Sequence, residues 1–150
     1  MRGAALAWAR FAVSAWVGAA ILYVVTSVRE VTDPRVDSVV RDVLVTIRFP
    51  AYYAAGTLLL ASAWLAALLA RRRWSVGLLT LALGLLIVDY FAVYQPLAAL
   101  VTPPGKPRTP EFQAYHLWSE GLNGTGLLLS IVAAATLSRT AVPRSESSVA

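Results

Sequence analysis

Residues 71–94 read RRRWSVGLLTLALGLLIVDYFAVY. After the three arginines this stretch carries no charge until Asp89, and an aromatic residue stands at each end of its apolar part, Trp74 and Tyr94. About 20 apolar residues in a helix cross the hydrocarbon core of a bilayer, and aromatic side chains anchor such helices at the two interfaces. Residues 74–94 therefore predict a transmembrane helix.

Three further apolar stretches of similar length are found at residues 6–28, 52–70 and 117–137. Of the 150 residues, 58% are hydrophobic and 14% are charged, whereas soluble domains carry about 25% charged residues. A signal peptide is the alternative for the first stretch, but its apolar run is longer than that of a typical signal, which favours a retained helix. The sequence predicts an all-α, integral membrane four-helix bundle over residues 1–137, followed by a disordered Ser-rich tail at 138–150.

Residues 34–48 show a different pattern, that of an amphipathic helix. Asp33-Pro34 resembles a helix start, and polar residues occupy one face of the segment. The other face is apolar and consists of Val36, Val39, Val40, Val43, Leu44 and Ile47. This spacing predicts one extra amphipathic helix lying along the membrane interface. We expect Phe49-Pro50 to break or kink the chain after it, and the prolines between Pro96 and Pro110 to form a loop without helix.

Basic residues stand at the ends of the apolar stretches and predict how the chain is oriented. Arg71–Arg73 lie in a very short loop, which the positive-inside rule places in the cytoplasm together with both termini. Twelve of the 13 basic residues are arginine and alanine is abundant, which indicates a GC-rich bacterial genome and hence an inner membrane. Bases at helix ends do not form the basic face of a nucleic-acid binder. The expected partner is the lipid bilayer; a second copy or another subunit of a membrane complex remains open.

Polar residues interrupt two of the predicted spans. Asp89 lies inside the third span, and the fourth opens with His116, Ser119, Glu120 and Asn123, whose spacing places them on one helical face. An ionisable group within a span is costly and should face the bundle interior. Counted along the helices, these residues share a depth in the half of the bundle away from Arg71–Arg73. We therefore predict that they converge there, with Arg48 as a candidate counter-charge.

Three roles are open for this cluster. It is a hydrogen-bonded network that fixes how the helices pack, a site for a cation, proton or small polar ligand, or a metal site using His116, Glu120 and Asp89. Cysteine is absent, the single histidine excludes bis-histidine haem, and no oxyanion hole accompanies Ser119 and His116. We expect no cofactor and no enzymatic activity. An accessory subunit of a larger membrane complex and a metal-dependent membrane oxidoreductase are the alternatives.

Several of these segments also resemble a known family. Phe112-x-x-x-His116-x-x-Ser119-x-x-x-Asn123, Phe49-Pro50-x-Tyr52 and Pro96-Leu97-x-x-Leu100 occur in the same order as similar motifs in the transmembrane protein 205-like family, and together extend over about three-quarters of the chain. The resemblance implies a four-helix membrane bundle in which His116, Ser119 and Asn123 form the characteristic polar face. It implies no particular reaction.

Overall fold

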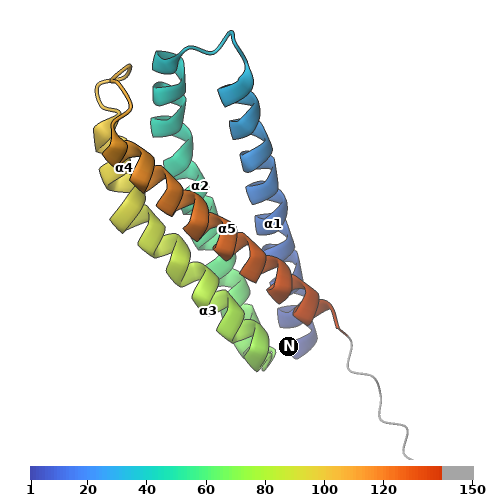
Figure 1. The fold of residues 1–150 in the computed structure, drawn as a ribbon. Coiled ribbons are helices and arrows are strands. Elements are labelled where there is room, and N and C mark those ends of the chain that lie inside the picture. Colours follow the sequence, from blue (N-terminus) through green and yellow to red (C-terminus); the bar gives the residue numbers. More distant parts are fainter. Residues whose placement is uncertain (140–150) are drawn as a thin grey trace, which may run out of the picture.

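The computed structural model describes residues 1–139, which contain helices and no β-strand. The helices are α1 (Arg2–Thr32), α2 (Ser38–Leu69), α3 (Arg73–Val88), the π-helix η1 (Asp89–Tyr94), α4 (Gln95–Leu100) and α5 (Pro110–Ser138). Because α3, η1 and α4 follow one another without a break, the chain forms four long rods (Figure 1). The predicted all-α four-helix bundle is confirmed. The predicted tail begins with Ser138 and Arg139 and otherwise lies outside the described residues.

Each of the four rods is long and apolar enough to cross a membrane. Their outer surfaces carry large apolar side chains, such as Leu58 on α2 and Leu128 on α5, which are 72% and 64% exposed. Helices satisfy their backbone hydrogen bonds internally, so an apolar exterior can face lipid without cost. The chain is a multi-pass membrane protein.

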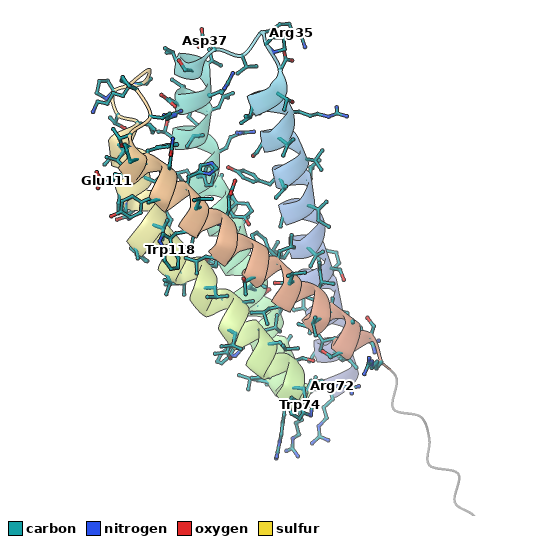
Figure 2. The ribbon with its side chains drawn as sticks, viewed as in Figure 1. Arg35, Asp37, Arg72, Trp74, Glu111 and Trp118 are labelled. Atoms are coloured by element: carbon teal, nitrogen blue, oxygen red, sulfur yellow. The ribbon has the colours of Figure 1, made fainter. Side chains whose placement is uncertain are left out.

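The two ends of the bundle are built from different parts of the chain (Figure 1). The start of α1, the α2–α3 turn and the end of α5 meet at one end, which we call the arginine end because it holds Arg71–Arg73. The α1–α2 connection and the loop between α4 and α5, residues 101–109, lie at the other, which we call the loop end. Arg72 and Trp74 mark the first end in Figure 2, and Arg35 and Asp37 mark the second.

Small residues bring the helices close together in the interior. Ala12, Ala63, Ala67 and Ala133 are completely buried between the rods. A Cβ atom added at Gly56 of α2 would lie 2.6 Å from the ring of Trp16 and 2.9 Å from Leu86. Close backbone approach at small residues is how helices pack in lipid, where the hydrophobic effect does not drive them together.

The prediction of an extra amphipathic interfacial helix at 34–48 is wrong, because these residues form the turn after α1 and the first part of α2. Asp33 caps the end of α1 and residues 34–37 form the turn, where the guanidinium and backbone N–H of Arg35 both donate to Asp33 and lower the pKa of that carboxyl. α2 begins at Ser38. Asp37 is its N-cap, and the Asp37 carboxylate accepts a hydrogen bond from the Val40 N–H at 2.8 Å. The helix then continues through Pro50, which is exposed, to Leu69. The segment is therefore the first part of the second transmembrane rod.

The polarity of this segment is also reversed from that of a soluble helix. Val39, Val43 and Ile47 of the apolar stripe point outward and are 40–65% exposed, whereas Asp42 of the polar face is 1% exposed. In a membrane protein the exterior is the apolar side, so a polar face turns toward the interior and toward partners that satisfy it. The periodicity identifies the two faces correctly, but which one is buried depends on the surroundings of the helix.

The prediction that Pro96 and Pro110 lie in a non-helical loop is also wrong. Pro96 falls in the first turn of α4, directly after the π-helix, and Pro110 is the first residue of α5. The hydroxyl of Thr109 caps α5 by accepting the Phe112 N–H at 3.1 Å. Proline is accepted at the start of α5 because the N–H it lacks would have no partner within the helix there, whereas Pro96 lies within the continuous third rod. α5 therefore starts about two turns before the predicted span at 117.

The turn between α2 and α3 contains an arginine in an unusual backbone conformation. Arg71 has φ 58°, and the next N–H, of Arg72, donates back to the carbonyl of Ala67 at 3.0 Å. This is the helix-ending arrangement in which glycine is usually found at the left-handed position. An L-residue there costs about 1–2 kcal/mol, so the chain retains a positive charge at a position where glycine would be more stable.

An ion pair between the buried Asp42 and the partly exposed Arg108 fixes the loop at the opposite end. One carboxylate oxygen of Asp42 pairs with Arg108, and the other accepts the Gly105 N–H at 2.8 Å. Gly105 has φ +87°, a conformation that favours glycine. The guanidinium of Arg108 also lies 4.3 Å from the ring centre of Phe112. Asp42 thereby joins the loop at residues 105–108 to α2, and Arg108 contacts the start of α5.

This arrangement predicts that Asp42→Asn loosens the loop without unfolding the bundle. Asparagine can still accept the Gly105 N–H but cannot form the ion pair with Arg108, so the loop opens more often. Trypsin should then cleave after Arg108 about tenfold faster, the change expected if opening becomes easier by about 1.4 kcal/mol. Asp37→Asn, which preserves an N-cap one turn earlier, serves as control and should leave the cleavage rate unchanged. Equal cleavage rates in wild type and Asp42→Asn would contradict the clamp.

Candidate functional site

The centre of the polar region is Asp89, the first residue of the π-helix, whose side chain is completely buried. Its Oδ2 atom accepts hydrogen bonds from the hydroxyl of Tyr53, from Ser119 Oγ at 3.2 Å and from Asn123 Nδ2. The donors come from α2 and α5, so one carboxylate oxygen links three of the four rods. Hydrogen bonds of this kind are needed to hold a carboxyl group inside a membrane bundle.

Asn123 extends this network to a second tyrosine. Its Oδ1 atom accepts a hydrogen bond from the hydroxyl of Tyr52 at 3.1 Å, while its Nδ2 atom also reaches the Ser119 carbonyl at 3.0 Å. Asn123 therefore uses both ends of its amide, donating to Asp89 and accepting from Tyr52. We call Asp89, Tyr52, Tyr53, Ser119 and Asn123 the Asp89 network.

The local structure of each rod explains why these groups meet. Ser119 and Asn123 are four residues apart on α5 and project from one face. Asp89 starts a π-helix, a wider turn that re-aims the side chains after it and is frequently found at functional sites. Tyr53 is 3% exposed in the middle of α2, three residues before the close contact at Gly56.

The sequence did not lead us to include either tyrosine. Both lie in Pro50-Ala51-Tyr52-Tyr53, which we interpreted as the entry to the second span. A signal was nevertheless present, because a tyrosine hydroxyl within a transmembrane helix requires a hydrogen-bond partner when it is buried. Asp89 was the acceptor available at that depth.

Arg48, the predicted counter-charge, does not belong to the Asp89 network. Its guanidinium pairs with Glu30 of α1 at 2.5 Å and lies 5.5 Å from the ring centre of Tyr23. Within residues 1–139, no basic side chain lies within salt-bridge distance of Asp89. Arg48 therefore stabilises the packing of α1 against α2 and is not the counter-charge of Asp89.

His116 and Glu120 form a pair of their own. His116 Nδ1 lies 3.3 Å from Glu120 Oε1, and the two side chains are 52% and 64% exposed. They line the same cavity as Ser119 and Asn123, so all four residues of the predicted polar face of α5 border one cavity. Only Ser119 and Asn123 reach inward as far as Asp89.

This cavity has a volume of about 320 Å³ and lies between the loop-end halves of α1 and α5. We call it the α1–α5 cavity. Tyr23 and Ser27 line it from α1, Phe49 and Tyr52 from α2, and the four polar residues from α5. The hydroxyl groups of Tyr23 and Ser27 are themselves buried within the α1 wall of the cavity. The cavity thus adjoins the Asp89 network.

The predicted metal-binding trio does not come together. Among the described residues, no three His, Asp or Glu side chains gather closely enough to hold a metal ion. Asp89 is engaged by hydroxyl and amide groups, while His116 and Glu120 pair at the more exposed side of the cavity. The geometry therefore favours a hydrogen-bonded network beside an open cavity over a metal centre.

We predict that Asn123→Leu destabilises the protein, because it removes one donor to Asp89 and leaves Tyr52 without its acceptor. Loss of buried partners of this kind costs about 1–3 kcal/mol, which should lower the midpoint of thermal unfolding in detergent by several degrees. Thr125→Leu, on the exposed side of the same helix, is the matched control. If both variants unfold at the wild-type temperature, the network is not needed for stability.

Comparisons of the chain with protein-family models, with curated proteins and with solved structures find no match. The site is therefore interpreted from its own residues. The resemblance of residues 112–123 to the transmembrane protein 205-like family stays a prediction. What the geometry identifies is a multi-pass membrane protein with a buried hydrogen-bonded carboxyl group and, next to it, a cavity lined by aromatic and polar side chains.

Proposed function

We propose that this chain is a non-enzymatic membrane protein that binds a small organic cation in the α1–α5 cavity. The observation that carries the proposal is the lining of the cavity: the carboxylate of Glu120 and three aromatic rings, inside a membrane-spanning bundle. A volume of about 320 Å³ suits a small organic molecule and is at the lower end of ligand-binding pockets in proteins.

The charges around the cavity favour a positively charged ligand. Among residues 1–139, Glu120 is the one carboxylate in the lining, and no arginine or lysine accompanies it there. Arg48 is nearby but is engaged by Glu30. A cation entering the cavity would meet the exposed carboxylate of Glu120.

The rings of Tyr23, Phe49 and Tyr52 form a contiguous aromatic wall. The ring centres of Tyr23 and Tyr52 are 4.5 Å apart, and those of Tyr23 and Phe49 are 5.2 Å apart. Aromatic faces attract cations, most strongly where water is excluded. Val24, Val28 and Leu97 supply apolar surface for the body of the ligand. On this proposal the Asp89 network has a supporting role, because it holds Tyr52, Ser119 and Asn123 in place at the base of the cavity.

We infer further that the protein resides in a bacterial inner membrane, with the arginine end in the cytoplasm. Arg10, Arg71–Arg73 and Arg139 belong to that end, and so do the start of α1 and the end of α5, which supports cytoplasmic termini under the positive-inside rule. Membership of the transmembrane protein 205-like family fits this assignment, since Ser119 and Asn123 of the shared motif contact Asp89 and His116 lines the cavity.

Calorimetric titration of the detergent-solubilised full chain with benzyltrimethylammonium tests the proposal. We expect saturable binding that Glu120→Gln weakens about fivefold, as loss of a partly exposed charge contact of about 1 kcal/mol implies. Glu111→Gln removes the same charge from the same helix outside the cavity and should leave the affinity unchanged. Absence of binding, or equal affinities of Glu120→Gln and wild type, would exclude a cation site at this position.

An accessory subunit of a membrane complex is the second candidate. Ser14 and Gly18 on α1 and Gly121 and Thr125 on α5 are pairs of small residues that face outward, whereas Ala63 and Ala67 pack inside the bundle. Outward small residues permit close contact with another helix. For this candidate, native mass spectrometry after release from mild detergent should detect a second copy or another protein at fixed stoichiometry. A bare monomer would count against it.

A further inference from the structure

We propose that a pocket at the arginine end binds the phosphate headgroup of an anionic phospholipid. The pocket has a volume of about 750 Å³ and lies between the start of α3 and the last turns of α5. It is at the opposite end of the bundle from the α1–α5 cavity, so the inference does not depend on the proposed cation site.

Four guanidinium groups line this pocket, from Arg71, Arg72, Arg73 and Arg139. Within residues 1–139, none of them has an acidic partner at salt-bridge distance. At the loop end, Arg35, Arg48 and Arg108 each pair with a carboxylate, whereas Arg29, Arg41 and Lys106 have no acidic partner among the described residues. The positive charge of the pocket is thus not neutralised by the described protein, and guanidinium groups are well suited to bind phosphate oxygens in pairs.

The backbone adds donors at the same place. α3 begins at Arg73 and its N-cap, Arg72, makes no side-chain hydrogen bond to the first turn. The first N–H groups of a helix have no partner within the helix, and they favour an anion such as phosphate. Arg71 contributes its charge from a left-handed conformation that favours glycine. The arginine side chains and the unpaired N–H groups at the start of α3 therefore lie at the same end of the pocket.

The remaining walls explain why a lipid fits better than a free ion. Leu78 and Val132 line the pocket on the side that leads into the membrane and supply an apolar surface for an acyl chain. Ser75 and Thr136 also line the pocket, and their hydroxyl oxygens lie 2.9 Å apart, within hydrogen-bond distance. On this proposal they lie at the depth between the lipid headgroup and its acyl chains. Trp74 is 87% exposed and extends beside Arg72 at this end of the bundle (Figure 2). Tryptophan is enriched at the depth of lipid headgroups, and basic pockets between transmembrane helices bind anionic headgroups.

The test is native mass spectrometry of the full chain in mild detergent, titrated with dioleoylphosphatidylglycerol and, separately, with dioleoylphosphatidylcholine. We expect one phosphatidylglycerol molecule to bind in preference to phosphatidylcholine. Arg71→Gly and Arg72→Gln should each weaken its binding about fivefold, the effect of one basic side chain near an anionic headgroup. Because glycine is favoured at position 71, Arg71→Gly removes the charge without straining the turn, and an unfolding temperature no lower than that of the wild type should verify this.

Arg35→Gln is the matched control, because it removes one arginine from the loop end. It should leave lipid binding unchanged; weakening as large as that of Arg71→Gly would mean that net charge rather than the pocket attracts the lipid, and would overturn the proposal. Equal binding of both lipids, or unaltered phosphatidylglycerol binding in the two pocket variants, would overturn it as well. Displacement of the lipid by millimolar inorganic phosphate would reassign the pocket to a free anion.

Discussion

A carboxyl group in the interior of a membrane-spanning bundle must obtain from the protein the hydrogen bonds that water would otherwise supply. Asp89 obtains three of them on a single oxygen, from Tyr53 on α2 and from Ser119 and Asn123 on α5. Hydrogen bonds are directional, whereas contacts between apolar helices in lipid are not. The three bonds to Asp89 therefore fix the rotation and depth of α2, α5 and the rod that carries Asp89. The position of Tyr52 follows through Asn123, and with it one wall of the α1–α5 cavity.

The same requirement explains the inverted polarity of α2. Asp42 turns inward because Arg108 and the Gly105 N–H satisfy it there, while the valines of the opposite stripe turn toward lipid. A soluble helix with this pattern would bury the valines and expose the aspartate. In this protein the buried charges therefore act as connections between segments: Asp89 joins the rods near the middle of the bundle, and Asp42 joins the α4–α5 loop to α2.

How far the sequence predicts this structure depends on whether a feature is local. Apolar length identifies the four rods, and helical spacing places Ser119 and Asn123 on one face at the depth of Asp89, because both properties are set along a single helix. Choosing a partner requires knowing which helix is the neighbour and how it is rotated. Arg48 shares the loop-end half of the bundle with Asp89 but pairs with Glu30 on α1, and Tyr53 reaches Asp89 only through the packing of α2. The π-helix likewise has no signature in apolar periodicity, and the third rod continues from it into α4, whose first turn contains Pro96.

The distribution of charge along the bundle ties these observations to what the protein can bind. At the loop end, the acids and bases of α1, α2 and the α4–α5 loop largely neutralise one another, which leaves Glu120 as the carboxylate that faces the α1–α5 cavity. At the arginine end, the described residues contribute arginines without acids. Ionic interactions in a low-dielectric surrounding act over longer distances than in water, so each end attracts ligands of opposite sign. The proposed cation site toward one interface and the proposed anion site at the other follow from one arrangement, in which the acids of residues 1–139 are confined to the half of the bundle that contains Asp89.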